Sequence, residues 1–481
     1  MKETSLFDSL LEEPQKPTGP VTCLGMTFEN DEARRAHFTE ELRKKLQDPE
    51  FRKIEGFPIG SDEDILNLSD PPYHTACPNP WIADFIAEWE AQKPSKPEGY
   101  HYHREPFAAD VSEGRSGIFY DAHSYHTKVP HKAIMRYILH YTEPGDIVFD
   151  GFCGTGMTGV AAQMCGDREE VMSLGYQVKP DGTILQEETD ENGKKVWRPF
   201  SKLGVRRAVL NDLSTAAAFI AYNFNAPVDV NTFEKAARNL ITRVENECGW
   251  IYETYHQASG AKGKINYIIW SDVFICPNCS GEIVFWDSAV DLSLGRLKDS
   301  IECQNCGTNH AKKDLDRVWL SEFSTASNSI VKKVKQIPVL INYTFDGKRY
   351  EKKPDAKDFA VIEKINDLRV DEPAGETTIP DGFNTRQPKL SHGVSSVRDF
   401  YTKRNFYALS VLRQSLPKDR VGKAIEFLIN SYDLTHSTLM TRVIFKGGGK
   451  KPVLTGYQSG TLYISSLPVE KNIFQGILKQ K

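Results

Sequence analysis

Residues 146–159 combine an apolar segment, an acid and spaced glycines in a way that can hold a nucleotide-like ligand. The apolar residues 147–149 indicate a strand, which ends in Asp150. The loop that follows has a GxGxxG pattern made by Gly154, Gly156 and Gly159. Glycines let the backbone approach a ligand, and the helix N-terminus that follows favours negative charge. The pattern predicts a cofactor site at the carboxyl end of the first strand of a doubly wound α/β sheet.

The residues between the strand and the first glycine narrow the choice of cofactor. A dinucleotide-binding loop usually begins with glycine at the strand end, where a pyrophosphate comes close. Here Asp150, Gly151 and Phe152 occupy that point. A carboxylate repels pyrophosphate and suits a ligand with a cationic ammonium and sulfonium, so S-adenosylmethionine is the expected cofactor. A dinucleotide enzyme and a purely structural turn are the two alternatives, since the glycine pattern alone is weak.

Four cysteines form two CxxC pairs, a spacing that brings thiolates together on tight turns. The pairs are Cys276 with Cys279 and Cys303 with Cys306, and the apolar residues 283–286 between them are expected to form a strand. Four thiolates make a closed tetrahedral site, which is structural and not catalytic. We expect Zn²⁺ in a zinc ribbon, with iron as the minor alternative.

The surrounding elements follow from hydrophobic spacing and turn residues. Helices are expected at 31–46, 81–92, from 124 or 130 onward and from 214, and strands at 147–149 and 207–212. Turn signals in 167–203 predict an inserted β-ribbon. The expected domains are an N-terminal region (1–110), a cofactor-binding domain (111–271, with its β-ribbon insertion at 167–203), a zinc ribbon (272–320) and a mixed α/β C-terminal region (321–481).

Composition places this 481-residue chain among ordinary globular proteins. Apolar residues make up 40% and charged residues 26% of it. The formal net charge of -5 gives no overall signal for nucleic acid, so a DNA-binding surface has to be local. No run of 18 apolar residues and no apolar leader is present, which predicts a cytoplasmic protein with no membrane partner.

Two segments resemble the amino-group DNA methyltransferases. The run 150–156 resembles their cofactor motif D-P-F-x-G-x-G-T-T, with Gly151 in place of the proline. The segment 126–130 resembles the H-x-T-x-K-P stretch that precedes this motif. The resemblance adds Thr127 and Lys128 to the cofactor-binding residues, and it places Asp212 on the ribose hydroxyls of S-adenosylmethionine.

The same family has a catalytic D-P-P-Y motif, which Asp70, Pro71, Pro72 and Tyr73 match. In the family, the motif stacks a flipped base on the aromatic ring, and the acid and a prolyl carbonyl accept hydrogen bonds from its amine. The motif normally ends a buried apolar strand, whereas residues 63–69 are only half apolar. A rigid turn bounded by prolines is therefore the alternative interpretation.

The resemblance implies a methyltransferase that acts on DNA in a restriction-modification setting, and it favours adenine N6 over cytosine N4. The alternative is a non-catalytic cofactor-fold or DNA-binding subunit whose catalytic half lies on a missing segment or a second chain. Residues 398–451 hold eleven basic residues against four acidic ones. They predict DNA contact, with a solvated helix face as the alternative.

Overall fold

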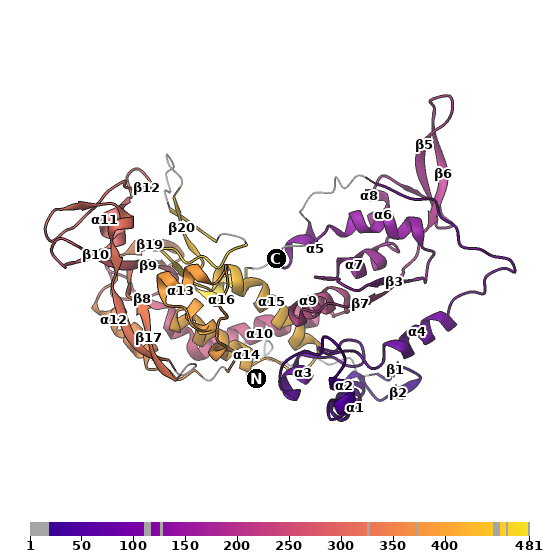
Figure 1. Cartoon of the computed structure of the whole chain (residues 1–481), viewed down its shortest axis with the longest axis horizontal. Helices are drawn as coiled ribbons and strands as arrows, with labels where there is room; N and C mark the ends of the chain where they lie inside the picture. Colours follow the sequence, from indigo (N-terminus) through magenta and orange to yellow (C-terminus); the bar gives the residue numbers. More distant parts are fainter. Residues whose placement is uncertain are drawn as a thin grey trace, which may run out of the picture. The chain divides into compact units, whose positions relative to one another are not determined.

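The computed structural model describes residues 19–109, 117–125, 128–324, 328–370, 373–445, 453–457 and 460–479. The chain forms two compact units (Figure 1). The first unit is made by residues 1–230 together with Asp419–Phe427, and the second by Asn231–Lys418 together with Leu428–Lys481. The four segments expected from the sequence divide the chain more finely than these units do, and they stay predictions.

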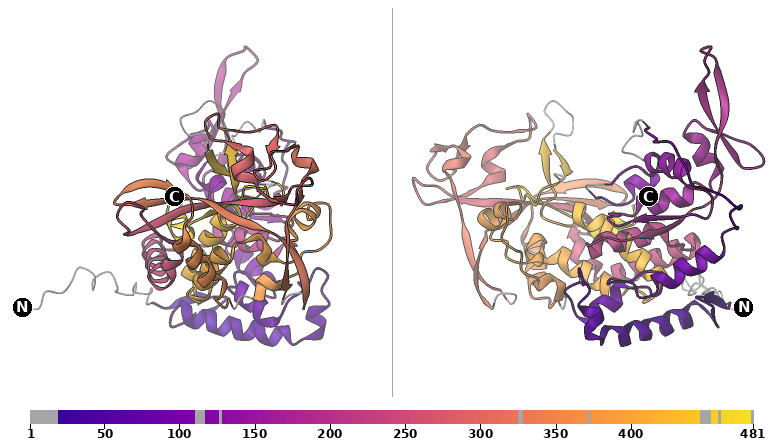
Figure 2. Two further views of the ribbon diagram at one scale, coloured as in Figure 1. Left: turned by 90° about the vertical axis from the view of Figure 1, so that its left-hand side faces the viewer. Right: turned by 45° about the vertical axis from the view of Figure 1, so that its right-hand side comes forward.

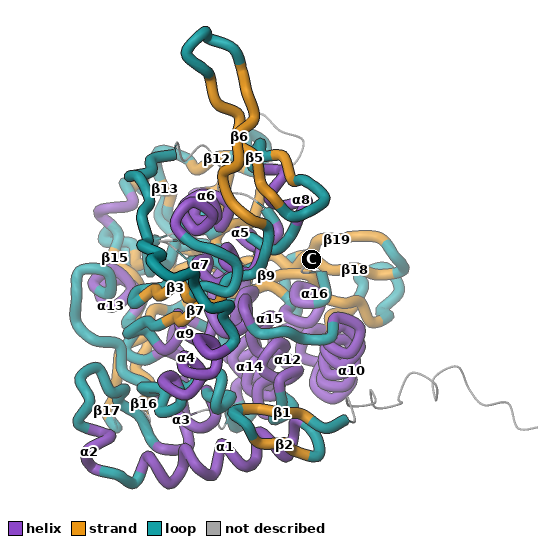
Figure 3. The backbone as a smooth tube through the Cα atoms, turned by 90° about the vertical axis from the view of Figure 1, so that its right-hand side faces the viewer, coloured by secondary structure: helices purple, strands orange, loops and turns teal. Residues whose placement is uncertain are grey.

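The N-terminal part of the first unit is a layer of short elements around one long helix. Helix α1 has the bounds predicted for it, Asp31–Leu46, and Asn30 caps it by accepting a hydrogen bond from the Ala33 amide at 2.8 Å. Its apolar positions are few, but Phe38, Leu42 and Leu46 are buried. Figure 3 shows α1 beside α3 and the β1–β2 hairpin. The elements of this layer are β1 (Val21–Cys23), β2 (Met26–Phe28), α2 (Pro49–Arg52), α3 (Asp62–Leu68) and α4 (Ile82–Ala91).

The rest of the first unit is built on a parallel pair of strands. Strand β3 (Ile147–Asp150) pairs with β7 (Arg207–Leu210), and Asp150 lies opposite Leu210. The helices are α5 (Ile118–Asp121), α6 (His131–Tyr141), α7 (Met157–Met164), α8 (Arg168–Ser173) and α9 (Thr215–Asn225). Helices α6 and α7 pack through a core that includes Met135, Leu139, Ala161 and Ala162. The expected doubly wound sheet is present in the described residues only as this two-stranded piece of a mixed α/β fold.

A twisted ribbon separates β3 from β7 in the sequence, where an insertion was expected. It is a three-stranded antiparallel sheet of β4 (Gln177–Val178), β5 (Thr183–Thr189) and β6 (Lys195–Lys202). Figure 2 shows the β5–β6 hairpin standing clear of the helices of its unit. Residues 168–173 form α8 and not ribbon, because Asp167 caps them by accepting a hydrogen bond from the Glu170 amide.

The second unit is organised by one long central strand, β9 (Lys262–Ile275). It belongs to a seven-stranded sheet, whose other strands are β8 (Glu253–Tyr255), β10 (Glu282–Val284), β15 (Asp316–Arg317), β18 (Gln336–Phe345), β19 (Lys348–Lys352) and β22 (Val469–Lys471). Small two-stranded sheets add β11 (Val290–Asp291), β12 (Arg296–Leu297), β13 (Ile301–Glu302), β14 (Asn309–His310), β16 (Trp319–Ser324), β17 (Ser329–Val334), β20 (Arg442–Phe445) and β21 (Val453–Gly456).

Helices complete this unit: α10 (Val230–Cys248), α11 (Phe285–Ala289), α12 (Ala356–Asn366), α13 (Arg386–His392), α14 (Lys403–Gln414), α15 (Arg420–His436) and α16 (Ile473–Ile477). The first turns of α15 belong to the first unit, and the rest of the helix belongs to the second. Within the described ranges, no helix has both the length and the apolar character needed to cross a membrane.

Candidate active site

The glycine loop lies at the carboxyl end of the parallel strand pair. Because β3 and β7 run in the same direction and in register, the loops that follow Asp150 and Leu210 leave the sheet at the same edge. The Cys153 amide donates to the Asn211 carbonyl at 2.9 Å, which joins the two loops. This is the edge at which open α/β sheets bind their ligands.

Two carboxylates organise this edge. The side chain of Asp150 accepts hydrogen bonds from the Phe152 amide at 3.1 Å and from the Thr158 hydroxyl at 2.5 Å. Asp212 accepts from the Gly154 amide at 2.9 Å and from the Ser214 amide at 2.9 Å. Each carboxylate has about four acceptor positions, so two such bonds leave capacity for a ligand. The predicted cofactor acids are thus both at the loop, on neighbouring strands.

Helix α9 packs against the glycines of the loop and leaves no room for side chains there. Gly156 has a φ of 74°, and a Cβ on it would lie 2.7 Å from the Ala221 Cβ. A Cβ on Gly159 would lie 2.3 Å from the Asn225 Oδ1. The Asn225 side-chain amide donates to the Gly156 carbonyl at 3.0 Å. Glycine is therefore required at both positions for the loop and α9 to meet.

Apolar side chains at the loop face solvent. Phe152 is 83% exposed, and Leu213 is 74% exposed. Burial, followed by the charges of Asp212 and Asp150, raises the pKa of Cys153 to about 12, which keeps this thiol protonated at neutral pH. Because the thiolate is the nucleophilic form, a protonated Cys153 argues against a nucleophilic role for this residue. The exposed rings and aliphatic groups provide apolar contact area for a ligand at this edge.

The segment before α6 is only partly described. Thr127, which the sequence predicts as a cofactor-binding residue, lies outside the described residues. Lys128 is buried, and its Nζ donates to the carbonyls of Phe119, Tyr120 and His123. Burial lowers the pKa of Lys128 to about 8. These contacts use the three N–H groups of the ammonium, so they favour a structural role for Lys128, and its cofactor role stays a prediction.

The Asp-Pro-Pro-Tyr segment forms a closed turn at the end of helix α3, not at the end of a strand. Its backbone is held by a pair of hydrogen bonds between Asp70 and His74, at 2.8 and 3.1 Å. The Ser69 hydroxyl accepts from the Ala76 amide at 2.9 Å, and the Asn79 side chain donates to the Pro72 carbonyl at 2.8 Å. Residues 62–68 are helical because Ser61 and Asp64 make a reciprocal capping box.

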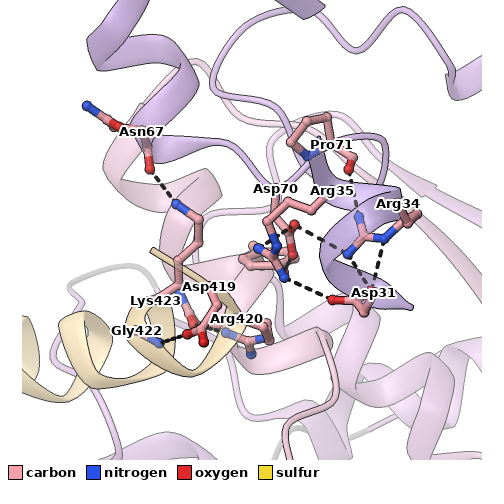
Figure 4. Close-up of polar contacts among 12 residues, drawn as sticks. Asp31, Arg34, Arg35, Asn67, Asp70, Pro71, Asp419, Arg420, Gly422 and Lys423 are labelled. Carbon is pink, nitrogen blue, oxygen red and sulfur yellow. Dashed lines mark hydrogen bonds and ion pairs between the residues drawn. The ribbon is translucent and has the colours of Figure 1, made fainter. Parts of the chain in front are cut away.

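The carboxylate of Asp70 is buried among donors (Figure 4). Asp70 is 2% exposed. Arg35 lies 2.7 Å from its Oδ1, and Arg34 lies 3.6 Å from the same atom. The hydroxyl of Tyr222 donates to its Oδ2. Burial, followed by the charge of Asp70, raises the pKa of Tyr222, so this phenol remains a donor at neutral pH.

Arg34 contacts the other groups of the turn as well. Its Nη1 donates to the Pro71 carbonyl at 2.7 Å, and its guanidinium carbon lies 4.8 Å from the centre of the Tyr73 ring. Tyr73 itself is 49% exposed. Burial disfavours the charge on Arg34, but Asp70 and Asp31 outweigh this effect and raise the pKa of the guanidinium. Arg34 therefore stays charged within the turn.

Helix α9 links the turn to the glycine loop. Tyr222 on this helix bonds Asp70, and Asn225, less than one turn later, bonds Gly156. His74 stacks on the Tyr222 ring with centroids 4.8 Å apart. The two motifs quoted from the sequence, some eighty residues apart, are thus attached to one helix of one compact unit.

Further cations come from the Asp419–Phe427 segment, which belongs to the same unit (Figure 4). Arg420 donates to the Asn223 side chain at 2.7 Å and to the Ala226 carbonyl at 3.0 Å. Lys423 donates to the Asn67 carbonyl. Burial lowers the pKa values of both groups. Their hydrogen bonds hold α9 and α3 in place around the turn.

Sequence reasoning missed four residues of this site: Arg34, Arg35, Tyr222 and Tyr125. The arginines lie in a helix dense with charge, so nothing in their spacing sets them apart. Tyr222 lies in an alanine-rich helix whose packing partners are distant in sequence. Burial, followed by the nearby charges of Asp212 and Cys153, raises the pKa of Tyr125, so this residue is close to the loop. Its position directly before the quoted segment 126–130 was the one available signal.

The four cysteines meet in the second unit, as their spacing predicts. Cys276 and Cys279 lie between β9 and β10, and Cys303 and Cys306 lie between β13 and β14. Their Sγ atoms all lie within 4.8 Å of one another, with 3.7 Å between Cys276 and Cys306 and between Cys279 and Cys303. A tetrahedron with Zn–S bonds of ~2.3 Å has edges of ~3.8 Å, so the donor set fits zinc.

The two halves of this cluster are alike. In each, an asparagine at the third position points to a thiol of the other half: Asn278 donates to Cys306, and Asn305 donates to Cys279. Residues 283–286, expected as a strand, divide into the end of β10 and the start of α11.

Three arginines of the basic C-terminal segment form ion pairs with acids. Arg398, Arg404 and Arg413 are paired with Glu376, Glu470 and Asp433. Arg404 is 3% exposed. These arginines are therefore engaged with acids and do not contribute to the expected contact of this segment with DNA. Residues 446–451, which include three of the eleven basic residues, lie outside the described residues.

Known proteins show one similarity to this chain. No curated protein and no solved structure matches it. Residues 39–181, however, match the family model described as DNA methylase of the N6/N4 type. That range includes both the Asp70–Tyr73 turn and the glycine loop, so this segment of the chain is similar to the amino-group DNA methyltransferases.

Proposed function

We propose that this chain transfers a methyl group from S-adenosylmethionine to an exocyclic amine of a DNA base, with adenine N6 preferred over cytosine N4. The observation that carries the proposal is the attachment of both family motifs to helix α9, through Tyr222 and Asn225. A methyl donor and a base amine have to meet within one site, and a shared rigid helix can hold the two half-sites at a fixed separation.

The glycine loop is the half-site for the cofactor. The cofactor supplies an electrophilic methyl group on a sulfonium. Asp150 and Asp212 offer carboxylate oxygens to its cationic and hydroxyl groups. Gly151, Gly154 and Gly156 let the backbone come close, and Phe152 offers an exposed ring. Strands β3 and β7 would then be the first two strands of a doubly wound sheet.

The Asp70–Tyr73 turn is the half-site for the base. An exocyclic amine is a poor nucleophile because its lone pair is delocalised into the ring. Hydrogen bonds from the amine to the Asp70 carboxylate and to the Pro71 carbonyl would localise that lone pair on nitrogen. The ring of Tyr73 would hold the flipped base by stacking, which offsets the few kcal/mol that flipping costs.

The four-cysteine cluster would hold one structural Zn²⁺ in the second unit. Four thiolates fill all four positions of a tetrahedral site and leave none open for catalysis. Loading the protein with Co²⁺ tests this assignment, because four thiolates give an intense tetrahedral visible spectrum. Cys303→Ser should change that spectrum, whereas Cys248→Ser, a buried cysteine outside the cluster, should not.

The test of the enzymatic proposal is labelled methyl transfer from S-adenosylmethionine to unmethylated plasmid DNA, followed by digestion to nucleosides. N6-methyl-2′-deoxyadenosine is the expected product, and Asp70→Ala should abolish it. Asp84→Asn, at an exposed acid of α4, is the matched control and should keep the wild-type rate. An absence of transfer by wild-type protein that binds the cofactor would contradict the proposal.

A second candidate function has one observation in its favour. Asp70 and Arg34 are each 2% exposed, so a base has no open path to the Asp70 carboxylate in this structure. A cofactor-fold or DNA-binding subunit without its own catalysis, working with a second chain, accounts for that burial. Under this alternative, transfer appears only when a second chain with its own Asp-Pro-Pro-Tyr motif is added.

A further inference from the structure

Arg34 makes each kind of contact that the Asp70–Tyr73 turn would offer to a base. Its Nη1 bonds the Pro71 carbonyl at 2.7 Å, its Nη2 lies 3.6 Å from the Asp70 carboxylate, and its planar guanidinium lies 4.8 Å from the Tyr73 ring centre. A carbonyl, a carboxylate and an aromatic face together select a flat group with N–H donors. A guanidinium and an amine-bearing base are both such groups.

Helix α1 holds this guanidinium in place. Asp31, one turn earlier, accepts from Arg34 Nε at 3.0 Å and from its Nη2 at 2.7 Å, which fixes the plane of the group. The helix is anchored beyond it by the buried side chains of Phe38 and Leu42. Helix α1 therefore keeps the Arg34 guanidinium in the turn, and its position does not depend on a flexible side chain alone.

Charge balance does not explain the contacts of Arg34. Arg35 lies 2.7 Å from Asp70, and Tyr222 donates to the other carboxylate oxygen, so Asp70 has a cation and a donor without Arg34. Neither of these partners reaches the Pro71 carbonyl. The bond to that carbonyl and the position over Tyr73 are features that a simple counter-ion does not need.

We propose that Arg34 is an intramolecular substitute for the target base, and that helix α1 has to withdraw it before a base can enter the turn. The inference rests on the proposed function, because it takes the turn to be the base-binding half-site. The two groups compete for the same Pro71 carbonyl and the same Asp70 carboxylate, so the resting protein is autoinhibited.

The test compares methyl transfer to unmethylated plasmid DNA by wild-type protein and by Arg34→Met, which keeps the side-chain length and removes the donors. We expect kcat/KM for DNA to rise at least about tenfold in Arg34→Met, with the affinity for S-adenosylmethionine unchanged. Arg34→Lys keeps a cation but loses the planar group of donors, so it should be accelerated like Arg34→Met. Arg43→Met, at an exposed arginine of the same helix, is the control for general effects on α1.

A small cation added to Arg34→Met can occupy the position that the guanidinium leaves empty, and this gives a second readout. Millimolar methylguanidinium should return the rate of Arg34→Met towards that of wild type, and methylammonium should not. A side chain with a merely structural role would show no such selective inhibition. If Arg34→Met does not fold, Asp31→Asn decides the question, because it removes the carboxylate that fixes the Arg34 guanidinium and also bonds Arg35, and it should raise the rate in the same direction.

Wild-type transfer that Arg34→Met or, in its place, Asp31→Asn does not accelerate would overturn the inference and leave the proposed function standing. The absence of transfer by wild type and by both variants, with the cofactor bound, would overturn the proposed function and the inference together.

Discussion

The two motifs of the first unit differ in whether their polar groups are free to bind a ligand. At the glycine loop, Asp150 and Asp212 each keep acceptor capacity, and Phe152 beside them is 83% exposed. At the Asp70–Tyr73 turn, the carboxylate and the Pro71 carbonyl are covered by Arg34 of α1. Both motifs resemble patterns of one family in the sequence, yet one half-site is open and the other is filled. A motif match therefore predicts a residue's chemistry and not its accessibility.

Among the tests of this difference between the loop and the turn, Asp70→Asn should have the largest effect. Removing one member of a buried charge cluster leaves Arg34 and Arg35 without their carboxylate, so we expect a loss of about 3–5 kcal/mol in the free energy of unfolding. Transfer should fall by about a hundredfold or more, because a preorganised acceptor is lost. Urea unfolding and the methyl-transfer assay measure the two effects. A variant with wild-type stability and rate would show that the turn is neither a charged core nor a catalytic site.

Gly156→Ala probes the contact between the loop and α9. The new Cβ would overlap the Ala221 Cβ, so we expect a destabilisation of about 1–3 kcal/mol, with weaker cofactor binding. Gly193→Ala in the β5–β6 hairpin is the matched control, since Gly193 has a φ of 75° and open space around it. It should show only the cost of the left-handed backbone, about 1–2 kcal/mol. Equal effects on cofactor affinity in the two variants would argue against a close approach of α9 to the loop.

His74 gives the turn a pH dependence. Burial, and then the charge of Lys423, lowers the pKa of His74 to about 4 from an ordinary value near 6.5. Between these values the unfolded chain binds the proton more readily, so the free energy of unfolding rises with pH across this window and falls on acidification. The slope should be up to about 1.4 kcal/mol per pH unit.

His74→Gln should flatten that slope in urea unfolding measured from pH 7 to pH 4. His101→Gln, at an exposed histidine of the same unit, should leave it unchanged. A slope that persists in His74→Gln would assign the acid sensitivity to other groups of the chain.

Phe152→Ala should have the smallest effect. Because the ring is exposed, its loss should not change the melting temperature of the protein. Affinity for S-adenosylmethionine should fall about three- to tenfold, in line with the ~0.5–1.5 kcal/mol of an aromatic contact. Phe323→Ala, at an exposed ring of the second unit, is the control for loss of surface apolar area. Calorimetric titration that finds identical affinities in both variants would remove Phe152 from the cofactor site.

Local features of the sequence predicted local structure well. Helix α1 has the bounds expected for it, and α9 begins directly after Ser214, where a helix was expected to start. The meeting of the four cysteines followed from their spacing. In contrast, residues 283–286 were expected as a strand and are shared between β10 and α11.

Long-range contacts were beyond the reach of the sequence. The contact of Arg34 with Pro71 spans 37 residues, and that of Tyr222 with Asp70 spans 152. Such pairs depend on how helices pack, which periodicity does not encode. The same holds for the basic C-terminal segment, because the acids that pair with Arg398 and Arg404 lie outside it in the sequence. Its contact with DNA stays a prediction.

The most direct test of the central claim, that the loop holds the cofactor and the turn holds the base, is calorimetric titration of S-adenosylmethionine into three proteins. Wild type should bind the cofactor, Asp150→Asn should bind it about ten- to a hundredfold more weakly through loss of a charged acceptor, and folded Asp70→Asn should bind it as wild type does. Absence of binding to wild type, or an equal loss in the two variants, would contradict the separation of the two half-sites.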